Sequence, residues 1–409
     1  MKKHLLAAVP ALALLVLAPA PAAAQPQAQP SRAAPAAPQP RQISASFAPG
    51  ARAIPFELFR GTRIFFQGTI NGRPASMMLD SGAGSTVISK RYADAIRLAG
   101  TRPMMVRGVG GTEQASLAQN VAVSAGALTV NGVSAIIIDI AETEAQIGRP
   151  IDVILGMEAF RAGIVDVDFS ARMIRFAPAQ GFVPPVGAVV VPISQGSTRR
   201  TIPISVNGGP PIEADLDIGN GGALLLSHAA WQGQREIAAI PSVMSSAGGV
   251  GGRIAKRLVT LPTVSVAGQT FRNVPSLLNV GANDLPETGA NVGIELLRRF
   301  RLLFHYDRST LYLVPDPAAI ARPLQKNRHG MRLRLAGDRL SIDEVMAGSP
   351  AAAASLQVGQ EIVAVNGRAV DERFWFRDDA QFGDLPAGTR IALTRADGIV
   401  VSLTLRDFF

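Results

Sequence analysis

The sequence predicts a mainly β protein, in which two homologous β lobes are followed by a small α+β domain. Glycine (40 residues), proline (29 residues) and frequent Val and Ile runs favour short strands and turns over long helices. An internal repeat indicates that one fold unit occurs twice. A C-terminal segment then breaks the repeat and carries its own pattern of strands and helices.

The repeat is clearest where residues 154–178 align on residues 291–315, at an offset of 137 positions. The same offset places Asp80 on Asp217. Further matches keep the same order along the chain: Gly156 with Gly293, Glu158 with Glu295, and Pro178 with Pro315. We therefore expect lobe one at residues 53–180, lobe two at 186–318, and the C-terminal domain at 326–409.

The N-terminal segment indicates the compartment. Lys2 and Lys3 precede an apolar stretch and a small-residue site that ends at Ala24, so residues 1–24 are predicted to be a cleaved signal peptide. The alternative is an uncleaved membrane anchor. Residues 25–52 have the Ala, Pro and Gln content of a linker, and ordered sequence is expected from near Ile54. Because the chain has no cysteine, disulfides and thiolate chemistry are excluded, and an exported protein of this kind suggests a bacterial periplasm.

The charge pattern argues against several function classes. The formal net charge is +9, but the basic residues are scattered and not interleaved with aromatic residues, so no nucleic-acid partner is expected. The histidines that remain after residue 24, which are His228, His305 and His329, lack metal-ligand spacing. No G-x-S-x-G motif supports a serine hydrolase. We therefore expect no metal and no cofactor.

Local patterns predict individual elements of lobe one. Residues 63–82 read as a hairpin that turns at Asn71-Gly72, and residues 127–140 repeat this strand–Asn-Gly–strand pattern. Residues 89–100 read as a short helix, with Ser89 as N-cap and Gly100 as the stop signal.

The C-terminal domain has its own signals. We expect a short Ala-rich helix after Pro350, a strand that ends at Asn366-Gly367, a helix over residues 371–382, and a closing hairpin that turns at Asp397-Gly398.

The strongest chemical signal is a single aspartate at the end of an apolar strand. Asp80 is followed by the small residues of "SGAG", where a backbone can approach closely. The Ser81 hydroxyl can form a hydrogen bond within such a turn. Lobe two carries an equivalent D-x-G at residues 217–219. Asp80 could instead serve only to form the turn.

"LDSGAGST" resembles the aspartic peptidases, and retropepsin-like lobes in particular. "DVILGMEAF" is similar to the segment of that family that passes beside the catalytic turn, and two lobes on one chain resemble the pepsin arrangement. The resemblance implies a catalytic pair of Asp80 and Asp217, with the active-site turn formed by Ser81, Gly82 and Gly219. In aspartic proteases generally, two neighbouring carboxylates share one proton and activate water.

Lobe two departs from the family pattern at Ile218, where the family has a hydroxyl that bonds across the lobes. This departure leaves alternatives open. Asp80 could pair with its twin in a homodimer, or the protein could bind peptides without cleaving them. The recurring "GVGG" could form flap tips or ordinary turns, and its glycines are Gly108, Gly110, Gly111, Gly249, Gly251 and Gly252.

The tail resembles a PDZ domain through "AGSPAAAASLQVGQEIVAVNG", with Gln360 as a departure from the usual Asp. The resemblance implies that "HGMRL" binds a C-terminal peptide, with Gly330, Met331 and Leu333 as the contacting residues. The edge strand would lie at about residues 331–336 or 340–345, opposite the expected 371–382 helix. A purely structural tail is the alternative.

Together these features predict an exported aspartic endopeptidase that hydrolyses peptide or protein substrates. Its PDZ domain would recruit or regulate the substrate. We expect a monomer rather than a homodimer, and no stable membrane span in the mature protein. A non-catalytic peptide-binding protein that retains the protease fold is the rival interpretation.

Overall fold

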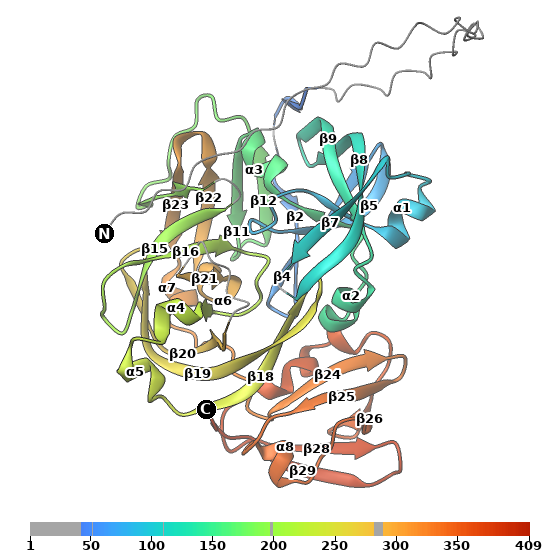
Figure 1. Cartoon of the computed structure of the whole chain (residues 1–409), viewed down its shortest axis with the longest axis vertical. Helices are drawn as coiled ribbons and strands as arrows, with labels where there is room; N and C mark the ends of the chain where they lie inside the picture. The colour runs from blue at the N-terminus through green and yellow to red at the C-terminus, as the bar shows by residue number, and fades with distance from the viewer. Residues whose placement is uncertain (1–41, 51, 109, 197–198, 282–288) are drawn as a thin grey trace, which may run out of the picture. The chain divides into compact units, whose positions relative to one another are not determined.

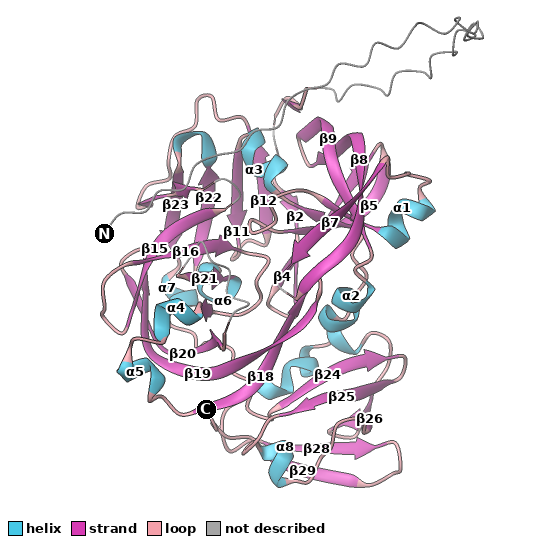
Figure 2. Cartoon of the chain, viewed as in Figure 1, coloured by secondary structure: helices cyan, strands magenta, loops and turns pink. Residues whose placement is uncertain are grey.

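The computed structural model describes residues 42–50, 52–108, 110–196, 199–281 and 289–409. The expected signal peptide, residues 1–24, and most of the expected linker lie outside these ranges. Strands dominate the described residues, as Figures 1 and 2 show, so the mainly β class is confirmed. No helix among the described residues is long and apolar enough to cross a membrane.

Lobe one is built on one sheet whose strands run in the order β1-β9-β6-β10-β5-β4-β8-β7, with β3 paired to β4. The strands are β1 (Ser44–Phe47), β3 (Glu57–Phe59), β4 (Arg63–Ile70), β5 (Arg73–Leu79), β6 (Val87–Ser89), β7 (Arg102–Gly108), β8 (Gly111–Ala125), β9 (Leu128–Ile138) and β10 (Val153–Leu155). The helices are α1 (Lys90–Ala95), α2 (Ala141–Ile147) and α3 (Met157–Ala162). The ordered chain therefore begins before Ile54, because β1 pairs with β9.

Sequence signals for lobe one were partly right. The β4–β5 hairpin turns at Asn71-Gly72 as predicted, and both turn residues have positive φ. The expected hairpin at Asn131-Gly132 is wrong. Those two residues lie inside β9, where Gly132 has φ 76° beside a register shift, and the true turn joins Ala125 to Leu128. Helix α1 has the expected Ser89 N-cap but ends at Ala95, well before Gly100.

Lobe two repeats the plan, with strand order β14-β15-β16-β21-β17-β20-β19-β18. The strands are β14 (Ser194–Gln195), β15 (Arg200–Val206), β16 (Ile212–Asp217), β17 (Leu224–Leu226), β18 (Ser242–Gly249), β19 (Gly252–Val266), β20 (Gln269–Asn279) and β21 (Ala290–Gly293). The helices are α4 (His228–Trp231), α5 (Arg235–Ala238) and α6 (Ile294–Leu297). In both lobes the strand that leads to the aspartate pairs in parallel with the strand of the repeated segment, β5 with β10 and β16 with β21.

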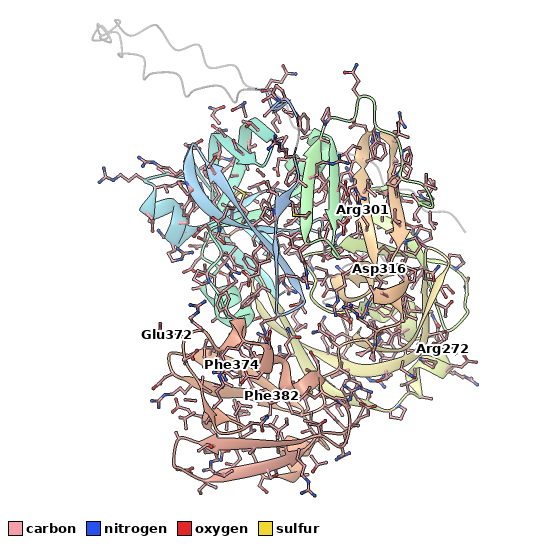
Figure 3. All side chains as sticks on the ribbon, turned by 180° about the vertical axis from the view of Figure 1, so that it is seen from behind. Arg272, Arg301, Asp316, Glu372, Phe374 and Phe382 are labelled. Carbon is pink, nitrogen blue, oxygen red and sulfur yellow. The ribbon has the colours of Figure 1, made fainter. Side chains whose placement is uncertain are left out.

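A further sheet joins the two lobes, in the order β13-β23-β22-β11-β12-β2. Its strands are β2 (Ile54–Pro55), β11 (Ile164–Asp168), β12 (Met173–Ala177), β13 (Val189–Pro192), β22 (Phe300–His305) and β23 (Thr310–Pro315). The lobes meet where β11 pairs with β22. Buried Asp166 of β11 accepts two hydrogen bonds, of 2.8 and 2.7 Å, from Arg301 of β22. Figure 3 labels Arg301 on this sheet. Helical turn η1 (Tyr306–Arg308) joins β22 to β23, and α7 (Pro317–Ile320) follows β23.

The C-terminal domain contains a separate sheet, in which the strands run in the order β24-β25-β26-β28-β29 and β27 pairs with β26. Its strands are β24 (Met331–Ala336), β25 (Arg339–Val345), β26 (Glu361–Val365), β27 (Arg368–Ala369), β28 (Arg390–Arg395) and β29 (Val400–Thr404), and its α-helix is α8 (Pro350–Ala353). The closing hairpin is β28–β29, as predicted. The expected 371–382 helix is instead two 3₁₀ segments, η2 (Phe374–Phe376) and η3 (Asp378–Asp384), with a kink at Gln381.

The C-terminal domain packs on lobe one through a shared apolar cluster. Phe59 of β3 contacts Phe376 of η2, with ring centroids 5.0 Å apart. The guanidinium of Arg60 lies 3.7 Å from the ring centroid of Trp375. Such cation–π contacts stabilise a partly buried junction.

Candidate active site

The lobe-one turn begins where β5 ends. The Asp80 N–H donates to the carbonyl of Leu155 in β10 at 3.1 Å, which ties the turn to the repeated segment. Oδ1 of Asp80 then accepts hydrogen bonds from the N–H groups of Gly82 (2.8 Å) and Ala83 (3.1 Å). A Cβ at Gly156 would lie 2.7 Å from the backbone of the same turn, so only glycine allows this close passage. The expected position of "DVILGMEAF" beside the turn is therefore observed.

The lobe-two turn begins at the last residue of β16, Asp217. Its Oδ1 accepts from the N–H of Asn220 at 2.9 Å, and its Oδ2 accepts from Nδ2 of Asn291 at 2.8 Å. Asn220 in turn donates its own Nδ2 to Oδ1 of Asn291 at 2.7 Å. Two asparagines therefore hold the second carboxylate in a fixed orientation.

The two turns meet at the interface between the lobes. A Cβ built on Gly82 would lie 2.6–2.8 Å from the carboxyl atoms of Asp217. In the same way, a Cβ on Gly219 would collide with the carboxyl group of Asp80. Each aspartate therefore packs against the glycine of the opposite turn, and one chain brings all four predicted residues together.

Ser81 forms a bond between the lobes rather than within its own turn. Its hydroxyl donates to the carbonyl of Leu216 at 2.7 Å and accepts from the N–H of Ile218 at 3.1 Å. Lobe two cannot return this bond, because Ile218 has no hydroxyl and is fully buried in the core. The local bond that the turn sequence allows is therefore not the one formed, because both contacts of the hydroxyl are with backbone groups of lobe two.

Electrostatics near the two carboxyls favour a shared proton. Burial and the neighbouring Asp217 carboxyl raise the pKa of Asp80 to about 7. The hydrogen bond from Gly82 and the charge of Arg63 act in the opposite direction but do not offset this rise. The site therefore contains an aspartate that holds a proton at mildly acidic pH.

Arg63, the first residue of β4, is a basic neighbour that sequence reasoning missed. Its Nη1 donates to the carbonyl of Thr62 at 2.8 Å, and a side chain at Gly221 would collide with its guanidinium. Burial lowers the pKa of Arg63, and the nearby Asp217 and Asp80 act to raise it. No feature of the linear sequence places Arg63 beside these carboxyls.

The sequence-based prediction also did not include Asn291, although the internal repeat indicates it. The 137-residue offset aligns Asn291 with Ile154, so a polar residue replaces an apolar one in an otherwise apolar strand. Such a substitution in a buried strand indicates a hydrogen-bonding task.

The two "GVGG" hairpin tips touch each other. The Gly110 N–H donates to the carbonyl of Val250 at 2.9 Å. A Cβ on Gly108 would overlap the backbone of Val250, and one on Gly251 would overlap Gly111. The tips belong to β7–β8 and β18–β19, where Gly108 pairs with Gly111 and Gly249 with Gly252. Glycine is therefore required where the two hairpins cross.

The predicted peptide-binding residues of the C-terminal domain lie at the start of edge strand β24. Met331 and Leu333 are buried, and Gly330 precedes them with φ 77°. Gly330 and Met331 each donate their backbone N–H to a nearby side chain, at 2.8 and 2.9 Å. Among the described residues no group of three or more His, Cys, Asp or Glu side chains is arranged to hold a metal ion.

Comparisons with protein families agree with this geometry. A family model described as aspartyl protease matches residues 66–159, which run from β4 into α3 and include the Asp80 turn. A second model, described as PDZ domain, matches residues 319–374. No curated protein matches the chain. The chain therefore contains a retropepsin-like aspartyl protease domain and a C-terminal PDZ domain.

Proposed function

We propose that this protein is an exported aspartic endopeptidase that hydrolyses peptide bonds in polypeptide substrates, with its PDZ domain engaging the substrate. One observation carries the proposal. Within a single chain, Asp80 packs against Gly219 and Asp217 packs against Gly82, so both carboxyls meet at the lobe interface. Burial, together with the neighbouring Asp217 carboxyl, raises the pKa of Asp80 to about 7, as expected for one of two carboxyls in a shared site.

The proposed reaction uses water and the two carboxyls. The ionised carboxyl removes a proton from a bound water, and the water oxygen attacks the carbonyl carbon of the scissile bond. The protonated carboxyl donates its proton to the carbonyl oxygen, which gives a neutral tetrahedral intermediate. Collapse of the intermediate breaks the C–N bond, and a proton passes to the departing amine. Because the pair titrates as a unit, the two roles are assigned to the pair and not to either residue.

Ile218 favours a second candidate, a peptide-binding protein that retains the protease fold without cleavage. Against this candidate, Asn220 and Asn291 donate hydrogen bonds to the Asp217 carboxylate, which supports a role for Asp217 as the charged partner of Asp80. A homodimer that pairs two copies of Asp80 is a third possibility. The proposal requires neither, since Asp217 of the same chain already lies at the site.

The mechanism is tested with Asp80→Asn on unfolded casein at pH 5. The purified wild type should cleave casein, and Asp80→Asn should lose at least about 10³-fold in kcat, because Asn cannot exchange the proton. Asp94→Asn is the matched control, since Asp94 is an exposed residue of α1. Equal cleavage by wild type and Asp80→Asn would refute the mechanism, and absence of cleavage by the wild type would favour the binding protein.

Export is proposed from residues 1–24. Expression of the full chain in a Gram-negative host should yield a periplasmic protein whose N-terminal sequence begins at Gln25. Recovery of the intact N-terminus in the membrane fraction would contradict cleavage and favour an anchor.

A further inference from the structure

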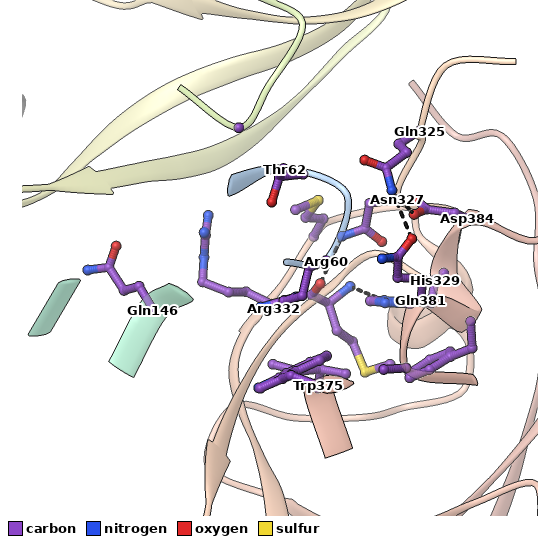
Figure 4. A pocket seen from close by; sticks show the side chains of 17 residues that line it. Arg60, Thr62, Gln146, Gln325, Asn327, His329, Arg332, Trp375, Gln381 and Asp384 are labelled. Atoms are coloured by element: carbon purple, nitrogen blue, oxygen red, sulfur yellow. Dashed lines mark hydrogen bonds between the residues drawn. The ribbon is translucent and has the colours of Figure 1, made fainter. Parts of the chain in front are cut away.

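A cavity of about 360 Å³ lies where lobe one, lobe two and the PDZ domain meet. Figure 4 shows Thr62, Gln146 and Arg332 around it, with Trp375 and Gln381 on the PDZ side. Lobe two contributes Gly221. The cavity therefore belongs to neither domain alone.

The cavity adjoins the catalytic turns through two of its lining residues. Gly221 follows Asp217 by four positions in the lobe-two turn. A Cβ on Gly221 would meet both the Arg63 guanidinium and, at 3.0 Å, the Cβ of Thr62. Gly221 and Thr62 therefore place the cavity beside Arg63 and the lobe-two turn.

The PDZ loop beside the cavity has its donors already occupied. The Gly330 N–H donates to Oδ1 of Asn327 at 2.8 Å, and the Met331 N–H donates to Nδ1 of His329 at 2.9 Å. Asn327 also donates its Nδ2 to the Met331 carbonyl at 2.8 Å. A C-terminal carboxylate would have to displace both side-chain acceptors before it could use these N–H groups.

The His329 acceptor persists at neutral pH. His329 is buried and its ring lies tilted against that of Phe382, with ring centroids 4.9 Å apart. Burial, with a smaller contribution from Arg60, lowers the pKa of His329 to about 3. The imidazole is therefore neutral and Nδ1 stays available to Met331. Other charged groups that line this cavity are Arg60, Arg332 and Asp384.

The edge of β24 offers the alternative mode of binding. Among the described strands β24 pairs only with β25, so an extended segment would pair with its other edge beyond Met331, whose N–H and carbonyl are already bonded to His329 and Asn327. Met331, Arg332 and Leu333 of this strand line the cavity together with Phe382 of η3. An extended segment on this edge would place apolar side chains against Leu333 and Phe382.

We propose that this cavity is a remote substrate subsite of the proteolytic function above, and that it takes an internal, extended segment of the polypeptide being cleaved rather than a free C-terminus. The occupied loop donors disfavour a terminal carboxylate. Gly221 lines the cavity four residues after Asp217, so the cavity borders the lobe-two turn, and we therefore assign the substrate itself as the occupant. The PDZ domain then selects long, unfolded chains over short peptides.

The first test compares substrate length. One casein cleavage site is made as a peptide of about six residues and as peptides extended to about twenty residues on either side, all with amidated ends. For one direction of extension, the long peptide should have at least a tenfold higher kcat/KM through a lower KM, equivalent to about 1.4 kcal/mol. Equal kcat/KM for all lengths would overturn the subsite while leaving the protease intact. Failure to cleave any peptide would instead count against the proposed function.

Two variants locate the effect. Gln381→Phe narrows the cavity from η3 and should bring the ratio of long to short kcat/KM close to one. Gln357→Phe is the matched control, because Gln357 is exposed on the same domain and does not line the cavity; it should keep the ratio. If Gln381→Phe keeps the wild-type ratio of long-peptide to short-peptide kcat/KM, the cavity is not the substrate subsite.

A binding assay tests the ligand class without cleavage and without altering the cavity. Fluorescence anisotropy of Asp80→Asn with the labelled long peptide should give the same Kd for the amide and the free acid. A free acid that binds tenfold or more tightly would show ordinary C-terminal recognition and overturn the proposal, and so would no detectable binding of the amide. Asn327→Ala with His329→Phe should free both N–H groups and create a preference for the acid.

Discussion

The two catalytic turns share one backbone plan but are held in different ways. In lobe one, Ser81 reaches across the interface and bonds both Leu216 and Ile218 of lobe two. In lobe two, Ile218 fills the core and returns no bond. Asp217 is instead oriented by Asn291, at the position where lobe one has Ile154. The lobe-two carboxyl therefore keeps its orientation without a hydroxyl at position 218, because other donors form hydrogen bonds to it.

Removal of the Ser81 hydroxyl should have the largest effect on the difference between the two turns. Ser81→Ala leaves the buried Ile218 N–H and Leu216 carbonyl without this partner, which should lower the free energy of unfolding by about 2–4 kcal/mol. Urea unfolding measures the change. Ser402→Ala, at an exposed position of β29, should change stability by less than about 0.5 kcal/mol. A similar small change for Ser81→Ala would mean that the cross-lobe bond does not stabilise the fold.

Asn291→Ile makes lobe two resemble lobe one and removes a donor to Asp217. We expect kcat to fall about tenfold to a hundredfold, because the carboxyl loses its fixed orientation. The pH–rate profile should also change, because Asn291 no longer donates a hydrogen bond to the carboxyl pair. Asn291→Ser keeps a donor and should restore part of the rate. A normal rate and pH profile in Asn291→Ile would show that the asparagine has only a packing role.

Stability should depend on pH through Asp80. Its pKa rises from 3.8 to about 7 on folding, so the folded state binds this proton more tightly than the unfolded state. The resulting stabilisation is complete below pH 3.8 and is lost as pH rises through about 7. Asp80→Asn cannot ionise, so its Tm should exceed that of the wild type at pH 8 and approach it near pH 4. An equal Tm difference between the two proteins at pH 4 and pH 8 would show that a group other than Asp80 causes the pH dependence.

Arg63 should have the smallest effect of the four. Its charge lowers the pKa of Asp80, so Arg63→Gln should move the upper limb of the pH–rate profile to higher pH by less than about one unit. Arg73→Gln is the control, since Arg73 is exposed on β5. A shift of this limb to lower pH would show that Arg63 does not act by lowering the pKa of Asp80.

Much of this arrangement follows from the sequence. Asn71-Gly72 predicts its hairpin because the turn needs two residues that accept positive φ. The 137-residue repeat pairs Asp80 with Asp217 because both lobes use the same strand order. Asn131-Gly132 gave a wrong hairpin prediction, because the same dipeptide also occurs at a bulge within a strand.

Other features lie beyond local patterns. Arg63 reaches the carboxyls only through packing against Gly221, which is far away in the chain. The 371–382 segment has helical composition, but its buried aromatic residues and the kink at Gln381 divide it into 3₁₀ turns. The occupied donors at Gly330 and Met331 depend on side-chain orientations that spacing does not determine.

The central claim is that Asp80 and Asp217 of one chain form the catalytic pair despite Ile218. The most direct measurement is kcat/KM of Asp217→Asn on a cleaved peptide at pH 5, with its mass in solution determined by sedimentation. An intramolecular pair predicts a loss of at least about 10³-fold with an unchanged monomeric mass. Full activity of Asp217→Asn would contradict the claim and point to two copies of Asp80 in a homodimer.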